Sequence, residues 1–218
     1  MSIKLFSVIV PKDITSAYLA RLEEIKIIPK GADKTYREHC LAYGLFGKKP
    51  SPYRVIDVGS VYSFLKYSRQ PLKIQPNFKK IAQIEELQTF DKPGQFTFKV
   101  ITVPIIRKRR NGKRYEIDPF VLEQEKSREA CYSSWLKKYF APGELIKVSL
   151  VYHNRRKVSR NQHSPKSLQN IFITEAEFTG ELQLTKKRLE KLLLSGVGRH
   201  KTFGYGMLLL AEKVPKND

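Results

Sequence analysis

The sequence predicts an α+β protein made of two tandem ferredoxin-like domains, each a βαββαβ unit. The first half shows patterns in the order strand, helix, strand, strand, helix, which are the first five elements of such a unit. A turn-forming cluster at 91–94 then precedes a second half of the same general type. At 218 residues the chain is long enough for two small domains with real cores. The expected domains are residues 1–90 and 95–218.

Local patterns predict the elements of the first half. Residues 3–10 are an apolar run that favours a strand. Asp33 can cap a helix through about residue 46, and the Gly- and Pro-containing run at 47–52 ends it. The remaining elements expected in this half are strands at 53–58 and 60–66 around Gly59 and a short helix at 78–87.

In the second half, alternation over 95–106 predicts a strand. Asn111 and Gly112 form the preferred dipeptide for a tight hairpin turn, so we expect the chain to return along 113–117. The other expected elements are a helix over 122–140, strands over 145–152 and 170–184 with a long polar loop between them, a helix capped by Thr185 that ends near Leu194, and a strand over 207–211.

Charge is the strongest global feature. The chain has 41 Lys and Arg against 21 Asp and Glu, a formal net charge of +20. Because such an imbalance costs self-repulsion, it favours a polyanionic partner, nucleic acid before all. An anionic membrane surface is the alternative, but no long basic amphipathic helix with a wide apolar face supports it. No apolar run reaches the roughly 18 residues of a membrane span.

The remaining compositional signals concern location. The N-terminal residues lack the layout of a signal peptide, so we expect none. Cys40 and Cys131 form neither a CxxC motif nor a zinc-binding spacing, which favours a reducing cytosol.

Tyr36 and His39 stand three residues apart on the predicted helix and therefore share a face. A histidine there can take a proton from a ribose 2′-hydroxyl or give one to a leaving 5′-oxygen, and the tyrosine hydroxyl can orient the phosphate. Such cleavage needs no metal, because the nucleophile belongs to the substrate, and the sequence offers no metal-ligand spacing. The alternative is a partly buried helix histidine satisfied by Glu38 or by a carbonyl.

Two basic segments are candidate RNA-binding surfaces. The first surrounds the predicted hairpin turn, and its cations are Arg107, Lys108, Arg109, Arg110, Lys113 and Arg114. The second is the predicted polar loop from residue 152 to 166, with the cations Arg155, Arg156, Lys157 and Arg160. Dense donors can contact phosphates, and Tyr152 can stack on a base of a single-stranded flank. The alternative for both segments is a solvated run of charge.

The stretch GVGRHKTFGYG at 196–206 lies between a predicted helix and a strand. Glycines let a backbone approach a ligand and expose N–H groups, and Arg199 and Lys201 add charge. The stretch is no ordinary nucleotide-binding loop, because it follows a helix and contains no GK[ST]. A glycine-rich turn is the alternative.

Three segments resemble the CRISPR-associated CasE-type repeat endoribonucleases. The segment FTGELQL at 178–184, the helix after it and the glycine-rich stretch are similar to that family's C-terminal signature, with Lys201 on its lysine. Tyr36-Arg-Glu-His39 followed by Tyr53-Arg54 resembles the family's first helix and the strand after it, and 130–136 resembles its mid-chain helix. The resemblance spans nearly the whole chain, in order.

The resemblance implies a RAMP-type tandem fold and a metal-independent endoribonuclease without a cofactor. Such an enzyme binds the stem-loop of CRISPR repeats in precursor crRNA and cleaves at the 3′ base of the stem by 2′-hydroxyl attack, which leaves a 2′,3′-cyclic phosphate. It then stays on the mature crRNA with the other subunits of an interference complex. The implied location is the prokaryotic cytoplasm, with no membrane partner.

The resemblance also implies residue roles. The implied catalytic residues are His39, Tyr36 and Lys201. The implied RNA contacts of the glycine-rich stretch are Gly196, Gly198, Arg199 and His200. Where family members can carry a basic residue after the histidine, this chain has Tyr43 and Gly44. The cation that stabilises the phosphorane is therefore Lys201, Lys48 or Lys49.

Two other functions stay open: a non-catalytic RNA-binding subunit of a CRISPR ribonucleoprotein, and an RNA-binding protein of ribosomal type. The pairing of Tyr36 with His39 favours the enzyme over the first, and a protein of ribosomal type would show broad RNA affinity without cleavage.

Overall fold

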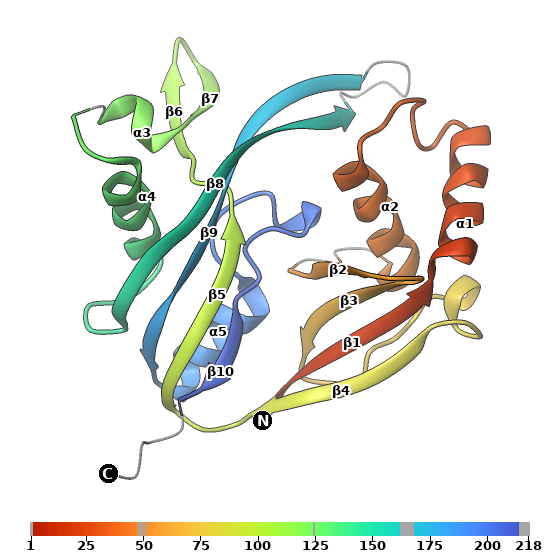
Figure 1. The fold of residues 1–218 in the computed structure, drawn as a ribbon, viewed down its shortest axis with the longest axis horizontal. Helices are drawn as coiled ribbons and strands as arrows, with labels where there is room; N and C mark the ends of the chain where they lie inside the picture. Colours follow the sequence, from red (N-terminus) through yellow and green to blue (C-terminus); the bar gives the residue numbers. More distant parts are fainter. Residues whose placement is uncertain (1, 48–49, 51, 124, 162–167, 214–218) are drawn as a thin grey trace. The chain divides into compact units, whose positions relative to one another are not determined.

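The computed structural model describes the chain except for residues 1, 48–49, 51, 124, 162–167 and 214–218. Its contacts divide the chain into two compact units (Figure 1). Unit 1 consists of Met1–Asp91, Arg156–Ile173 and Lys201–Gly204, and unit 2 consists of Lys92–Arg155, Thr174–His200 and Tyr205–Asp218. Two stretches that follow the turn cluster in sequence, 156–173 and 201–204, thus belong with the N-terminal residues.

Unit 1 contains a four-stranded sheet in the order β2-β3-β1-β4. Its strands are β1 (Ile3–Pro11), β2 (Arg54–Val58), β3 (Val61–Ser68) and β4 (Gln83–Phe90). Its helices are α1 (Lys12–Glu24) and α2 (Lys34–Phe46), and a 3₁₀ turn spans Pro76–Phe78. Figure 1 shows both helices over one face of this sheet. Val8 and Phe64 of the sheet join Leu19 of α1 and Leu41 and Leu45 of α2 in one buried core.

Several sequence predictions for unit 1 are confirmed. The strand at 3–10, the strand pair around Gly59 and the helix capped by Asp33 all form. Asp33 accepts a hydrogen bond from the backbone N–H of Tyr36 at 3.0 Å, as an N-cap does.

The predicted helix at 78–87 is wrong. Phe78 ends the 3₁₀ turn and is buried, and residues from Gln83 onward form the edge strand β4. Ile84 pairs with Val8 of β1 in an antiparallel register. Pairing with an open sheet edge thus overrides the helix propensity of this Glu- and Leu-containing segment. Helix α1, for which the sequence analysis predicted no element, begins directly after Pro11.

Unit 2 contains a second four-stranded sheet in the order β10-β5-β9-β8. The strands are β5 (Gly94–Thr102), β8 (Leu145–Asn161), β9 (Leu168–Leu184) and β10 (Leu209–Glu212), and the last residues of β8 and the first of β9 are assigned to unit 1. The helices are α3 (Pro119–Leu122), α4 (Arg128–Lys137) and α5 (Lys186–Ser195). A separate two-stranded ribbon pairs β6 (Ile106–Arg110) with β7 (Lys113–Ile117).

The hairpin and the helix capped by Thr185 are confirmed. Asn111 and Gly112 have φ angles of 49° and 73°, the left-handed conformations that a type I′ turn needs. Thr185 accepts from the N–H of Arg188 at 3.4 Å.

The predicted helix at 122–140 is wrong as a single element, because Ser127 caps a new helix after α3 has ended. The predicted polar loop after residue 152 is also wrong, since β8 continues to Asn161 and β9 begins at Leu168. Residues 162–167 of that loop lie outside the described part of the chain. Arg and Lys side chains can point to solvent from an extended ribbon, so a basic run does not exclude a strand.

The expected fold class is confirmed as α+β with tandem ferredoxin-like units. Numbered within its own unit, each sheet has the strand order 4-1-3-2. In unit 1 the second helix of the βαββαβ pattern is reduced to the 3₁₀ turn, and in unit 2 the ribbon is inserted after the first strand. Gly180 marks a close approach of β9 and β8, because an added Cβ would lie 2.0 Å from the carbonyl oxygen of Lys147.

Candidate active site and nucleic-acid interface

His39 lies half-buried on α2, beside the helix face that packs into the core of unit 1. Its Nδ1 atom is hydrogen-bonded to the backbone carbonyl of Thr202, which also accepts from the hydroxyl of Tyr53 at 2.9 Å. A carbonyl can only accept, so Nδ1 carries the proton. In the neutral ring, Nε2 is then the nitrogen that can accept one.

From the sequence, two roles are open for His39: a helix histidine satisfied by Glu38 or by a carbonyl, and a residue that transfers protons. The structure shows the carbonyl bond at Nδ1. That bond also fixes the ring tautomer that proton transfer at Nε2 requires, as the second partner of a functional histidine commonly does. Thr202 carried no sequence signal for this contact, because it stands 163 residues from His39.

Aromatic rings surround the imidazole. The ring centroid of His39 lies 4.7 Å from that of Phe203, 5.0 Å from that of Tyr43 and 6.3 Å from that of Tyr36. Tyr36 is only 9% exposed and belongs to the core, whereas Tyr43 is 44% exposed. The tyrosine presented to solvent beside His39 is therefore Tyr43, which the sequence analysis did not choose. The sequence feature that could have identified Tyr43 is its i, i+4 spacing from His39 on a helix.

Burial shifts the pKa values of two neighbours on α2. The pKa of His39 is lowered from its ordinary 6.5, chiefly by burial, while the bond to Thr202 opposes the shift. Burial raises the pKa of Glu38 to about 7, and the nearby charges of Lys34 and Arg156 oppose that rise. At neutral pH the imidazole is therefore mainly uncharged, the form that accepts a proton.

The end of β8 meets the first turn of α2 within unit 1. The carboxylate of Asp33, which caps α2, also accepts a hydrogen bond from the backbone N–H of Ser159. Arg156 lies near enough to act on Glu38, the neighbour of His39. Arg156 and the exposed Lys157 thus share unit 1 with His39, whereas Arg155 belongs to unit 2. Arg160 lies on β8 as well, but its side chain is outside the described part, as are Lys48 and Lys49.

Backbone hydrogen bonds attach both ends of the glycine-rich stretch to neighbouring elements. The N–H of Gly196 donates to Leu192 at 2.8 Å, and that of Gly206 donates to Ile101 at 2.7 Å. The N–H of Gly196 is therefore already used within the protein. Gly198 allows close packing, because an added Cβ would lie 2.3 Å from Oγ1 of Thr102.

The charged residues of the stretch differ in exposure. The side chain of His200 is 7% exposed, and its Nε2 atom lies 3.4 Å from Oε2 of Glu116 on β7. This burial argues against the direct RNA contact that is expected of His200 from the sequence. Lys201 is half-exposed in unit 1, in the turn that also carries Thr202 and Phe203. Arg199 is half-buried and influences the pKa of Tyr139.

The ribbon of β6 and β7 carries its described cations on exposed positions. They are Arg107, Lys108, Arg109, Lys113 and Arg114, and the side chain of Arg110 is outside the described part. Arg109 stands directly across from Arg114. Like charges in that position destabilise a ribbon, so the arrangement favours a polyanionic partner.

A family model described as CRISPR associated protein matches residues 18–212. The chain belongs to this family.

Solved structures with the same fold come from this CRISPR-associated group. Cas6e from Escherichia coli K-12 has a TM-score of 0.59 and 17% identity, covering 98% of this chain and 100% of that one. Cse3 from Thermus thermophilus, bound to an RNA that represents a pre-cleavage complex, has a TM-score of 0.60 and 16% identity, covering 97% and 100%. A chain of a CRISPR RNA-guided surveillance complex has a TM-score of 0.54 and 18% identity, covering 96% and 100%. None of the curated proteins compared with the chain matches it.

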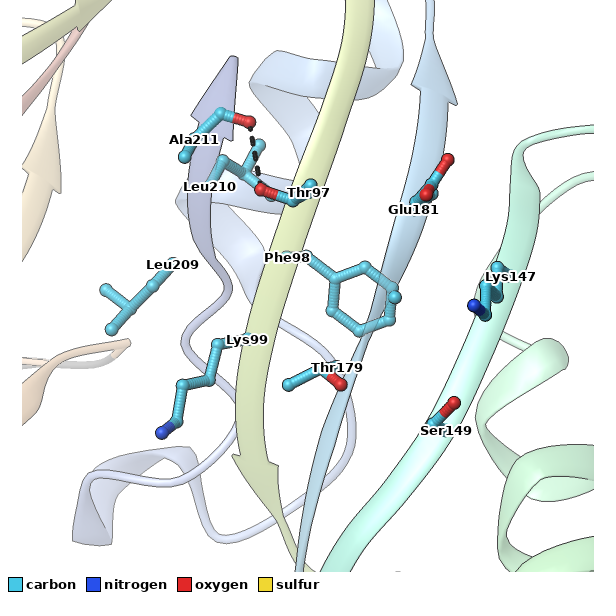
Figure 2. A pocket seen from close by; sticks show the side chains of 11 residues that line it. Thr97, Phe98, Lys99, Lys147, Ser149, Thr179, Glu181, Leu209, Leu210 and Ala211 are labelled. Atoms are coloured by element: carbon cyan, nitrogen blue, oxygen red, sulfur yellow. Dashed lines mark hydrogen bonds between the residues drawn. The ribbon is translucent and has the colours of Figure 1, made fainter. Parts of the chain in front are cut away.

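Among the described residues, no three His, Cys, Asp or Glu side chains gather as a group that can hold a metal ion. A pocket of about 550 Å³ lies on the sheet of unit 2, lined by residues of β5, β8, β9 and β10, including Lys99, Lys147 and Glu181 (Figure 2). None of its lining residues is a predicted site residue.

No helix in the described ranges is long and apolar enough to cross a membrane.

Proposed function

We propose that this CRISPR-associated protein is a CasE-type endoribonuclease that binds the stem-loop of a CRISPR repeat in precursor crRNA and cuts at the 3′ base of the stem. The observation that carries the proposal is the fixed tautomer of His39, beside an exposed tyrosine and a basic strand end. The fold it shares with RNA-bound Cse3 and with a chain of a surveillance complex supports the substrate. The protein is proposed to stay bound to the mature crRNA, as a subunit of an interference complex in the prokaryotic cytoplasm.

In the proposed reaction, Nε2 of His39 accepts the proton of the ribose 2′-hydroxyl. The 2′-oxygen forms a bond to its own phosphorus, and the bond from phosphorus to the 5′-oxygen breaks. The products are a 2′,3′-cyclic phosphate and a 5′-hydroxyl whose proton comes from water. The substrate supplies the nucleophile, so the protein's task is to orient it and to remove a proton.

Negative charge develops on the phosphorane oxygens, and a nearby cation stabilises it. Lys201 is retained as a candidate, because it lies next to the residue that holds His39. Arg156 is a second candidate, because it lies near enough to α2 for its charge to act on Glu38. Within this proposal Tyr43 contacts the nucleotide at the cut, and Tyr36 supports α2 from the core.

RNA affinity is proposed to come from the cations of the ribbon and of β8. Phosphate contacts supply most of the affinity of a basic protein for RNA, and a ribbon can place several along a stem. The formal net charge of +20 agrees with a large contribution of phosphate contacts to RNA affinity.

The deciding experiment uses two forms of one repeat hairpin in EDTA: the natural RNA, and an RNA with 2′-deoxyribose just 5′ of the scissile bond. We expect the natural RNA to be cut and the deoxy form to bind without being cut. Cutting of the deoxy form would mean that water attacks, and activity that needs added Mg²⁺ would exclude the metal-free mechanism. Tight binding of both forms without any cutting would instead support the non-catalytic RNA-binding subunit.

A further inference from the structure

The ribbon of β6 and β7 is its own two-stranded sheet. An isolated two-stranded hairpin is marginally stable in water. This one is weakened further by Arg109 and Arg114, which stand directly opposite each other. To present cations in a fixed orientation, the ribbon needs support from the rest of unit 2.

Glu116 is the single acidic residue between positions 106 and 117. Its Oε1 atom lies 3.4 Å from Nε of Arg107, its cross-strand partner on the ribbon. Its Oε2 atom lies 3.4 Å from Nε2 of His200 in the glycine-rich stretch. One carboxylate thus contacts both the ribbon and the body of unit 2.

The backbone conformation and the burial of His200 both favour a specific contact for its side chain. His200 has a backbone φ of 56°, a left-handed conformation that is uncommon for a residue with a Cβ. Its side chain is only 7% exposed. The strained backbone and the burial together favour a specific role for this side chain over that of an ordinary loop residue.

A second attachment holds the start of the ribbon. Gly198 packs against Trp135, whose ring an added Cβ would approach to 3.0 Å. The Nε1–H of Trp135 donates to the carbonyl of Ile105 at 3.0 Å, directly before β6 begins. The ribbon is therefore supported at the start of β6 by Trp135 and near the end of β7 by His200.

We propose that Glu116 and His200 form a positioning pair that holds the basic ribbon on the glycine-rich stretch in the orientation that grips an RNA stem. The inference rests on the proposed function, because it assigns the ribbon to the repeat hairpin. It gives the glycine-rich stretch a supporting task in place of direct RNA contact through His200.

The proposal and simple electrostatics predict opposite changes in RNA affinity for one substitution. Glu116→Gln removes a negative charge from a cationic ribbon, so screened electrostatics alone predicts tighter RNA binding. If Glu116 orients the ribbon, the same change loosens it and weakens binding. Glu129→Gln is the matched control, because Glu129 is exposed on α4 of the same unit and its substitution changes the charge equally.

The experiment measures the Kd for a repeat hairpin as a function of salt, for wild type, Glu116→Gln, His200→Asn, the double variant and Glu129→Gln. Asparagine suits position 200 because it tolerates positive φ. We expect Glu116→Gln and His200→Asn each to weaken binding about tenfold, and the double variant to be no weaker than the worse single variant, because the two residues act as one pair. The salt slope should also fall although no cation has been removed, which a loss of folded protein would not produce.

Equal or tighter binding by Glu116→Gln, with an unchanged salt slope, would overturn the proposal. Should His200→Asn melt below the assay temperature, Glu116→Gln decides alone, because its side chain is partly exposed on the ribbon. If the wild-type protein itself fails to bind the hairpin, it is the proposed function that fails. If wild type and all variants bind alike, the pair has no positioning role and the function stands.

Discussion

The Nδ1 atom of His39 on α2 donates a hydrogen bond to the backbone carbonyl of Thr202, a residue 163 positions further along the chain. The same carbonyl accepts from Tyr53, so its position is fixed from two sides. This arrangement leaves Nε2 as the proton-accepting nitrogen of the neutral ring.

Replacing His39 by alanine should slow cleavage and leave RNA binding nearly unchanged. A general base acts on a proton that moves only in the transition state, and its loss typically costs about 10²–10⁴-fold in rate. Single-turnover cleavage and a filter-binding Kd on one repeat hairpin separate the two effects. A wild-type rate would make His39 an ordinary helix histidine, and lost binding with a lower Tm would make it structural.

The cleavage rate should rise with pH and then level off. Burial lowers the pKa of His39 from 6.5, and the base must be deprotonated to act, so the rate should increase as pH climbs through that lowered value and be flat near neutrality. Single-turnover rates from about pH 5 to about pH 8 provide the profile. A rate that falls across this range would assign His39 the role of general acid instead.

Tyr43 and Tyr36 should respond differently to substitution. Tyr43 is 44% exposed beside His39, so Tyr43→Ala should weaken RNA binding by about 1–3 kcal/mol if a base stacks there, and Tyr43→Phe should retain most of it. Tyr36 is 9% exposed, so Tyr36→Ala should lower the free energy of unfolding by about 3–5 kcal/mol. RNA titration and thermal melts of the same variants test both. A Tyr43→Ala protein that binds and cuts normally would remove Tyr43 from the site.

Neutralising Arg107, Arg109, Arg110 and Lys113 together should weaken binding steeply. Every phosphate that the ribbon no longer neutralises should reduce the log–log slope of affinity against salt by up to about one unit. The control neutralises four exposed lysines of unit 1, Lys26, Lys30, Lys79 and Lys80, for the same change in charge. Equal slopes in the two variants would show that charge alone matters and that the ribbon makes no special contact with RNA.

Glu38→Gln should stabilise the protein at alkaline pH. Burial raises the pKa of Glu38 from 4.5 to about 7, so between these values the folded state binds more protons than the unfolded state. The free energy of unfolding of wild type therefore falls as pH rises through this window, by up to roughly 3 kcal/mol, and is constant above it. Thermal melts should show a higher Tm for Glu38→Gln than for wild type at about pH 8 and little difference at about pH 5. The exposed Glu24→Gln is the control, and an equal Tm change at both pH values would contradict the prediction.

The sequence by itself determined the features that depend on neighbouring residues. The Asn111-Gly112 turn, the cap of Asp33 on α2 and the cap of Thr185 on α5 are local hydrogen bonds or local backbone conformations, so short patterns predict them. The net charge needs no structure at all, and the order of strands and helices was enough for the tandem ferredoxin-like class. The helix wrongly predicted at 78–87 has a non-local cause, since β4 depends on pairing with a strand more than seventy residues earlier in the chain.

The tertiary structure alone decided which residues meet. Thr202 at His39, Ser159 at Asp33 and His200 at Glu116 are contacts between residues far apart in the chain. No helical or strand period encodes such pairs, because they arise only when packed elements exclude water and bring distant backbone groups together. Burial is likewise a property of the packed state. It distinguishes the core residue Tyr36 from the exposed Tyr43, and it shifts the pKa values of His39 and Glu38.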